Sequence, residues 1–129
     1  SGIFLVEVFH RLVDRWRFKN KRKIEFDDLK KILISSIYGV DINLDAVKVA
    51  AFSLYLAVLS YLEPKRLWKT VTFPCLIYNP NELNNKQGEN LYCLNTLEFQ
   101  TEKKFDLIIG NPPFKSSKTG SLGYIEKNY

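Results

Sequence analysis

Residues 104–114 read Lys-Phe-Asp-Leu-Ile-Ile-Gly-Asn-Pro-Pro-Phe, and the fold class that we predict starts from this stretch. The mostly apolar run from Phe105 to Ile109 predicts a buried strand of a parallel sheet, which the following Gly-Asn-Pro-Pro ends. Ligands of open α/β sheets lie outside the carboxyl ends of the strands, so we expect Asn111 to face a crevice there. Because proline restricts the residue before it to extended conformations, Asn111 and Pro112 are both held stiff.

The Asn-Pro-Pro-Phe tetrapeptide carries groups that can activate an amine. An amine on an aromatic ring is a poor nucleophile because its lone pair is delocalised, and carbonyls that accept its N–H bonds return that pair to nitrogen. Asn111 offers a side-chain carbonyl, Pro112 a backbone carbonyl, and Phe114 a face on which an extruded base can stack. The residues alone also allow a simpler interpretation, an Asn-Pro turn that closes a strand, with Phe114 in the core. The tetrapeptide resembles the catalytic motif of S-adenosylmethionine-dependent amino-methyltransferases, which implies that Asn111, Pro112, Pro113 and Phe114 are catalytic.

Composition indicates one globular domain. The chain has 129 residues, of which 46% are hydrophobic, enough for a single core. No apolar run approaches the ~20 residues of a membrane span. Cys75 and Cys93 lack the spacing of a metal site and nothing indicates secretion, so we expect reduced thiols in a cytoplasmic protein. His10 falls in a helical pattern and is expected on a helix surface.

The net charge of +5 is compatible with a polyanionic partner. Two aromatic residues, Trp16 and Phe18, are interleaved with the densest group of basic residues. A solvated helix end followed by a loop is the favoured interpretation, and a patch that contacts phosphates is the alternative. The basic residues of this group are Arg15, Arg17, Lys19, Lys21, Arg22 and Lys23.

The first residues lead directly into a helical pattern. Apolar residues recur on one face and predict a helix from about Ile3 to Arg17 or a little beyond. In the methyltransferase family this position resembles the end of an Asp-Pro-Ala-Cys-Gly-Ser-Gly motif, where a strand feeds a glycine turn beside the cofactor. The resemblance implies that Ser1 and Gly2 bind the cofactor, and that the first strand and most of the cofactor loop are absent.

A strand followed by a capped helix is predicted in the middle of the chain. A short helix through Ile34 precedes a strand from Ile37 to Asp41; Asn43 can cap the next helix, whose apolar stripe continues to Pro64. An acid at the carboxyl end of such a strand can accept hydrogen bonds from ribose hydroxyls, although it can also serve only its own turn. The sequence from Tyr38 resembles the second motif of adenine-specific DNA methyltransferases, which implies cofactor binding by Asp41 and Ile42.

A third strand is predicted from Leu91 to Leu94, after a stretch from Val71 to Tyr78 that can be extended and a polar loop from Asn84 to Asn90. The family commonly has an Asp after this strand, which binds the adenine amino group of the cofactor. The matching residue here is Asn95, whose carbonyl can accept from the same group without a charge. Together these elements predict part of a Rossmann-like class I methyltransferase fold, with residues 1–129 as a fragment of one catalytic domain that lacks the first and last strands.

The expected function is transfer of a methyl group from S-adenosyl-L-methionine to the N6 amine of adenine in DNA, as the modification activity of a restriction-modification system. DNA is the expected partner, with a specificity or restriction subunit or domain outside this chain. We expect the isolated chain to be inactive because most of the cofactor loop is missing. Two alternatives stay open: a protein-glutamine methyltransferase of release factors, which shares the Asn-Pro-Pro signature, and a catalytically silent scaffold or DNA-binding fragment.

Overall fold

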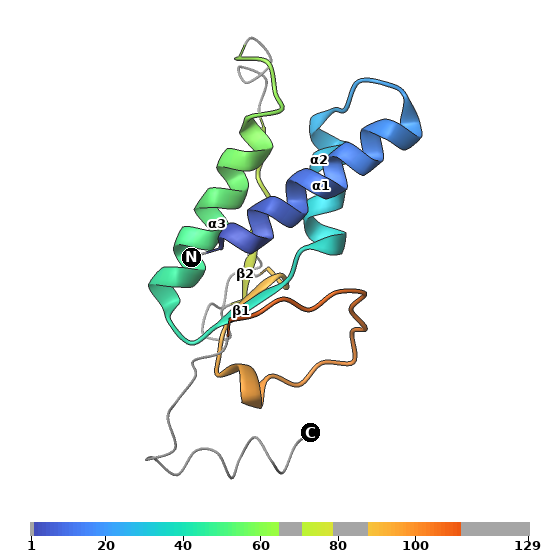
Figure 1. The fold of residues 1–129 in the computed structure, drawn as a ribbon. Helices are drawn as coiled ribbons and strands as arrows, with labels where there is room; N and C mark the ends of the chain where they lie inside the picture. The colour runs from blue at the N-terminus through green and yellow to red at the C-terminus, as the bar shows by residue number, and fades with distance from the viewer. Residues whose placement is uncertain (1, 65–70, 79–87, 112–129) are drawn as a thin grey trace.

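A computed structural model describes residues 2–64, 71–78 and 88–111. Three helices pack together and a small parallel sheet lies against them (Figure 1). None of the helices in these ranges is long and apolar enough to cross a membrane. The elements are α1 (Ile3–Asn20), α2 (Phe26–Ser36), β1 (Gly39–Asp41), α3 (Leu44–Leu59), β2 (Ile77–Tyr78), β3 (Leu91–Cys93) and the 3-10 turn η2 (Thr96–Glu98).

Side chains at the helix starts explain where α2 and α3 begin. Glu25 and Asp28 form a capping box at the start of α2, in which Asp28 Oδ2 accepts from the Glu25 N–H at 3.1 Å. The Asn43 side-chain oxygen accepts from the N–H groups of Asp45 and Ala46 at 2.9 and 3.2 Å. The predicted Asn43 cap is therefore confirmed, and so are the three predicted helices, although α3 ends at Leu59 rather than continuing to Pro64.

The sheet has the strand order β1-β3-β2, and both neighbouring pairs are parallel. Gly39 pairs with Leu91 and Asp41 with Cys93, while Ile77 pairs with Leu91 from the other side. The predicted strands around residues 37–41 and 91–94 are thus confirmed in slightly shorter form. An α/β arrangement with a parallel sheet is present, and the Rossmann-like classification stays a prediction.

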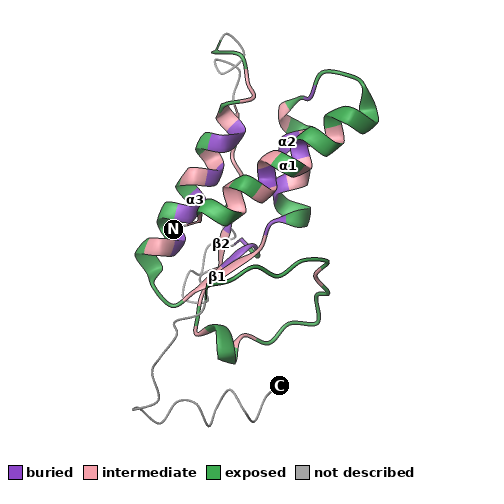
Figure 2. Cartoon of the chain, viewed as in Figure 1, coloured by how far each residue is buried: buried purple, intermediate pink, exposed green. Residues whose placement is uncertain are grey.

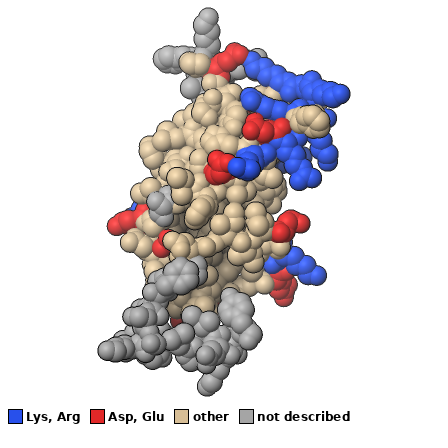
Figure 3. All heavy atoms as spheres, viewed as in Figure 1, with Lys and Arg blue, Asp and Glu red and all other residues tan. Residues whose placement is uncertain are grey.

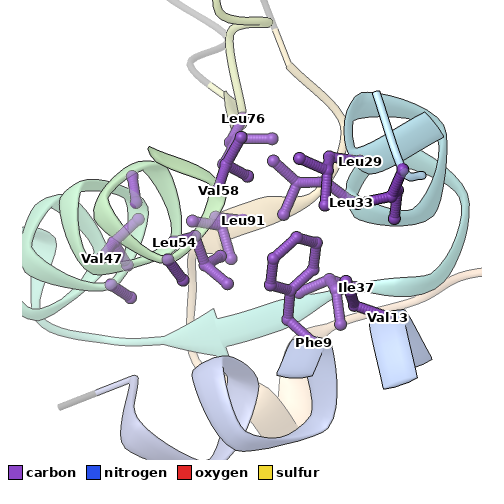
Figure 4. Packing of buried hydrophobic residues seen from close by; sticks show 14 residues of the cluster. Phe9, Val13, Leu29, Leu33, Ile37, Val47, Leu54, Val58, Leu76 and Leu91 are labelled. Atoms are coloured by element: carbon purple, nitrogen blue, oxygen red, sulfur yellow. The ribbon is translucent and has the colours of Figure 1, made fainter. Parts of the chain in front are cut away.

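The core lies between the three helices and the strands (Figures 2 and 4). Phe9 from α1 and Leu54 from α3 point toward Leu91 of β3 in its centre. One polar residue, Asn90, is buried with them at 4% exposure, just before β3. The largest fully buried side chains are Phe9, Leu29, Leu33, Ile37, Leu54, Leu76, Leu91, Val13 and Val58.

The predicted buried strand at residues 105–109 is wrong. The structure assigns no strand there, and the side chains of Leu107, Ile108 and Ile109 are 67%, 82% and 47% exposed. The segment meets the sheet region where the Phe105 ring lies 5.4 Å from that of Tyr38, the residue before β1. The apolar pattern reports a local preference, but a strand also needs partners for its backbone N–H and C=O groups and cover for its faces. Within the described residues, this segment obtains neither.

Candidate functional site

The carboxyl ends of β1 and β3 lie side by side at one edge of the sheet. The Leu94 N–H, just past β3, donates to the Asp41 carbonyl at the end of β1 at 3.1 Å. The Cys93 thiol approaches the Ile42 carbonyl at 3.6 Å. The structure therefore brings Asp41, Ile42 and Asn95 to the same edge, because each follows the end of one of two paired parallel strands. We call this the carboxyl edge.

The Asp41 carboxylate is half-buried and already holds its own turn. Its Oδ1 atom accepts from the Asn43 N–H at 2.9 Å. A carboxylate has about four acceptor positions in total, so most of them stay open to a ligand that brings hydroxyl donors. Ile42, next in the chain, is 74% exposed beside it. The turn and the ligand-binding interpretation of Asp41 are thus compatible.

Asn95 has a local role that the sequence interpretation missed. Its side-chain oxygen accepts from the Leu97 N–H at 3.2 Å and caps η2, while its Nδ2 donates to Glu98 Oε1 at 3.2 Å. An amide oxygen can accept two hydrogen bonds, so one acceptor position is left for a ligand amine. The signal was available in the sequence, because Asn followed three residues later by Glu is a pattern typical of a helix start.

Gly2 is the N-cap residue of α1 and has a left-handed backbone conformation, with φ at 82°, that other residues rarely adopt. A Cβ atom at this position would lie 2.7 Å from the Cβ of Ala50 in α3. Farther along, a Cβ at Gly39 would lie 2.9 Å from a methyl carbon of Leu5 in α1. These two close approaches place the first turns of α1 against both α3 and β1. Ser1, predicted to bind the cofactor with Gly2, lies outside the described residues.

Asn111 is exposed and follows segment 105–109, which pairs with no strand among the described residues. At the preceding Gly110, an added Cβ would meet no atom within 4 Å, so the backbone there is open on that side. Pro112, Pro113 and Phe114 lie outside the described residues. Among the hydrogen bonds and ring contacts of the described residues, none links Asn111 to the carboxyl edge.

Aromatic rings beside the strands are a second feature that the sequence interpretation missed. The Tyr92 ring in β3 lies 5.1 Å from that of Tyr78 in β2 and 4.9 Å from that of Phe99. The Lys103 ammonium lies 4.6 Å from the centre of the Tyr38 ring. Partial burial raises the pKa of the Tyr92 hydroxyl, and the nearby Lys103 charge opposes that change. These contacts need strands and loops distant in sequence, so no local pattern could reveal them.

An open groove of about 440 Å³ lies between α1 and α3. None of Gly2, Asp41 and Asn95 lines it. His10, predicted on a helix surface, lines the groove and is half-buried, because its Nδ1 lies 2.6 Å from the Tyr61 hydroxyl. The groove is therefore separate from the carboxyl edge.

Two comparisons with known proteins bear on this arrangement. Residues 35–129 match the family profile described as Eco57I restriction-modification methylase. The chain is also 28% identical to the type II restriction enzyme and methyltransferase RM.Eco57I of Escherichia coli, over 92% of this chain and 14% of that protein. The chain thus spans a small part of the length of this relative. No solved structure matches the chain. The matched residues contain β1, α3, β3 and Asn111, and since they make up most of the chain, the chain belongs to the Eco57I restriction-modification methylase family.

Proposed function

We propose that the protein transfers a methyl group from S-adenosyl-L-methionine to the N6 amine of adenine in DNA, as the modification activity of a restriction-modification system. The observation that carries the proposal is the position of Asp41. It is a half-buried carboxylate at the carboxyl end of a parallel strand, with acceptor positions to spare. Membership in a restriction-modification methylase family supports the same reaction class.

The residues of the carboxyl edge fit the hydrogen-bonding groups of this cofactor. Asp41 would accept from the ribose hydroxyls, and Asn95 would accept from the adenine amino group with its remaining lone pair. Ile42, exposed beside Asp41, would give apolar cover to the adenine ring. Ser1 and Gly2 would approach the cofactor through their backbone, at the start of α1. When bound, the cofactor supplies an electrophilic methyl group on a sulfonium.

The protein's own contribution to the chemistry would come from residues 111–114. Asn111 and Pro112 would accept hydrogen bonds from the adenine N6 amine and so return its lone pair to nitrogen. Pro113 would keep the turn stiff, and Phe114 would stack on the extruded base. The reaction would then be a direct displacement at the methyl carbon, in which positioning is the main source of rate acceleration.

Target recognition and restriction would be carried by parts of the protein outside residues 1–129, or by a separate subunit. The printed name of the Escherichia coli relative gives restriction and methyl transfer to one protein, and most of its length has no counterpart in this chain. Recognition of the DNA sequence would therefore lie outside this chain, while the residues of the carboxyl edge would bind the cofactor.

The test is transfer of radiolabelled methyl from the cofactor to DNA from a host that lacks the enzyme, with the full-length protein. Nucleoside analysis should find the label in N6-methyladenosine, and the Asn111→Ala variant should give none above background. Label in cytosine, or label confined to a protein such as a release factor, would contradict the proposal.

A further inference from the structure

Basic residues gather where α1 ends and the chain turns into α2 (Figure 3). Residues 14–31 contain eight Lys and Arg against four Asp and Glu, and so carry four of the five net positive charges of the whole chain. We call residues 14–31 the basic corner. Like charges held this close repel one another, so a function other than solubility would explain why so many gather here.

Three cations of the basic corner have partners within the fold. Arg22 makes two hydrogen bonds to the Asp28 carboxylate, at 2.8 and 2.9 Å, and this pairing lowers the pKa of Asp28. Lys23 forms an ion pair with Glu63. The Arg17 guanidinium lies over a tyrosine ring, 4.9 Å from its centre. These contacts tie the turn to α2 and to the end of α3, so they account for three of the cations structurally.

Within the described part of the chain, no ion pair, side-chain hydrogen bond or ring contact involves Arg15, Lys19 or Lys21. All three are exposed, and Arg15 and Lys19 are four residues apart on one face of α1. The negative end of the helix attracts cations, but this effect fades within the last turn and so does not include Arg15. Phe18 lies among them with 84% of its surface exposed, so a partner that covers this corner also removes an apolar ring from water.

We propose that the basic corner binds the phosphate backbone of duplex DNA, through Arg15, Lys19 and Lys21, without reading its sequence. The proposal rests on the proposed function in taking DNA as the substrate. Long, exposed cations on one helix face suit phosphate contacts, which fix the position of a protein on a duplex and carry no base information. The corner is thus a second contact surface, separate from the residues that handle the cofactor and the target base.

The length of α1 sets how far this surface lies from the first turns of the same helix. The first turns of α1 pack on α3 and β1, and its 18 residues lead away from them to the corner. An 18-residue helix spans roughly 27 Å. At about 3.4 Å per base pair this corresponds to roughly eight base pairs. The corner would therefore meet DNA beside the target, and its contribution should vanish for a duplex too short to reach it.

The test compares two pairs of charge-removing substitutions in the full-length protein. Arg15→Gln with Lys19→Gln removes two charges from the corner, and Lys48→Gln with Lys104→Gln removes two exposed charges elsewhere. Binding of a fluorescent duplex of about 30 base pairs, close to three helical turns, is followed by anisotropy as salt is varied. At about 0.9 per phosphate contact, losing two contacts should reduce the slope of log K against log salt by roughly 1.8.

The corner pair should show that smaller slope and bind DNA more weakly, while the control pair should bind like the wild type. For the corner pair, the KM for DNA should rise while kcat at saturating DNA stays unchanged. The pair Arg15→Lys with Lys19→Arg keeps both charges and should bind DNA like the wild type. Unchanged binding by the corner pair, or an equal loss in the control pair, would overturn the proposal. Binding is measured without cofactor, so the result stands apart from methyl transfer. Weakened DNA binding by the corner pair, with no N6 methylation by the wild type, would contradict the proposed function alone. N6 methylation by the wild type, with unchanged DNA binding by the corner pair, would contradict only the proposal for the basic corner.

Discussion

Asn90 is the residue whose loss should cost the fold most for its size, and Asn90→Ala is the variant to make. Its Nδ2 donates to the Ile37 carbonyl at 2.8 Å and the Ile34 carbonyl at 2.9 Å, and lies 3.5 Å from that of Leu33. It therefore ties the end of α2 to the approach to β1, from a position 4% exposed. Among the described residues, Asn90 is the one polar residue that is buried.

The magnitude follows from the two short hydrogen bonds. Each is worth about 1 kcal/mol net, and a carbonyl left buried without a partner costs about 1 to 3 kcal/mol. Since Ile37 is buried but Ile34 is partly exposed, water can reach only one of the two carbonyls. We therefore expect Asn90→Ala to lower the free energy of unfolding by about 2 to 4 kcal/mol. That is a large share of the roughly 5 to 15 kcal/mol that stabilises an ordinary domain.

Urea unfolding followed by circular dichroism measures this change, and Asn20→Ala is the matched control. Asn20 makes the same kind of bond, from Nδ2 to a carbonyl near a helix end at 2.8 Å, but it is exposed. Water can replace that donor, so the control should cost less than about 1 kcal/mol. With a slope of about 1 to 3 kcal/mol per molar urea, Asn90→Ala should lower the midpoint by about 0.7 to 4 M. Equal costs for the two variants would refute the reasoning from burial.

Three further predictions concern the site and the helix starts. Asn111→Ala should lower kcat by orders of magnitude with cofactor affinity nearly unchanged, whereas Asp41→Ala should mainly raise the cofactor's dissociation constant. Steady-state kinetics and calorimetry measure the two effects. The same pattern in both variants would contradict the division of roles. Gly2→Ala should lower the free energy of unfolding by about 1 to 3 kcal/mol, because its φ of 82° and the contact with α3 leave no room for a Cβ, and an unchanged melting temperature would argue against that contact. The bond to Arg22 lowers the pKa of Asp28, so its stabilisation is present above the ordinary pKa of about 3.9 and is lost as pH falls through the lower folded value. Melting curves of Asp28→Asn should therefore show a smaller loss of stability in acid than the wild type, and curves that stay parallel would exclude this role.

The features that could be predicted from the sequence are those that nearby residues determine. Asn43 and the apolar stripe of α3 follow from positions within one helix, so the cap was predicted correctly and so was most of the buried face, although Leu44 at the start of the stripe is 46% exposed. Asp41 is at the carboxyl edge because it ends a strand that its own neighbours specify. The assignment of roles to Asp41 and Asn111 stays a prediction.

The errors fall where distant segments decide the outcome. Asn90 was placed in a polar loop, yet it is buried because the fold brings it to residues more than fifty positions earlier in the chain. His10 lies on the surface of α1 as predicted, but its contact with Tyr61, which half-buries it, is equally distant in sequence and was not foreseen. For residues 105–109 the pattern is that of a strand, but pairing depends on a neighbour that a pattern cannot supply.

The exposed run at residues 107–109 has a practical consequence for anyone who handles the chain. Leu107, Ile108 and Ile109 are adjacent, apolar and largely β-branched, and this is the composition of segments that pair with copies of themselves and aggregate. Asp106 and the two prolines after Asn111 flank the run, and such residues limit how far a self-paired ladder can grow. Ile108→Lys should therefore raise the solubility of the chain, because it interrupts the apolar run with a charge, and light scattering at rising protein concentration would measure this.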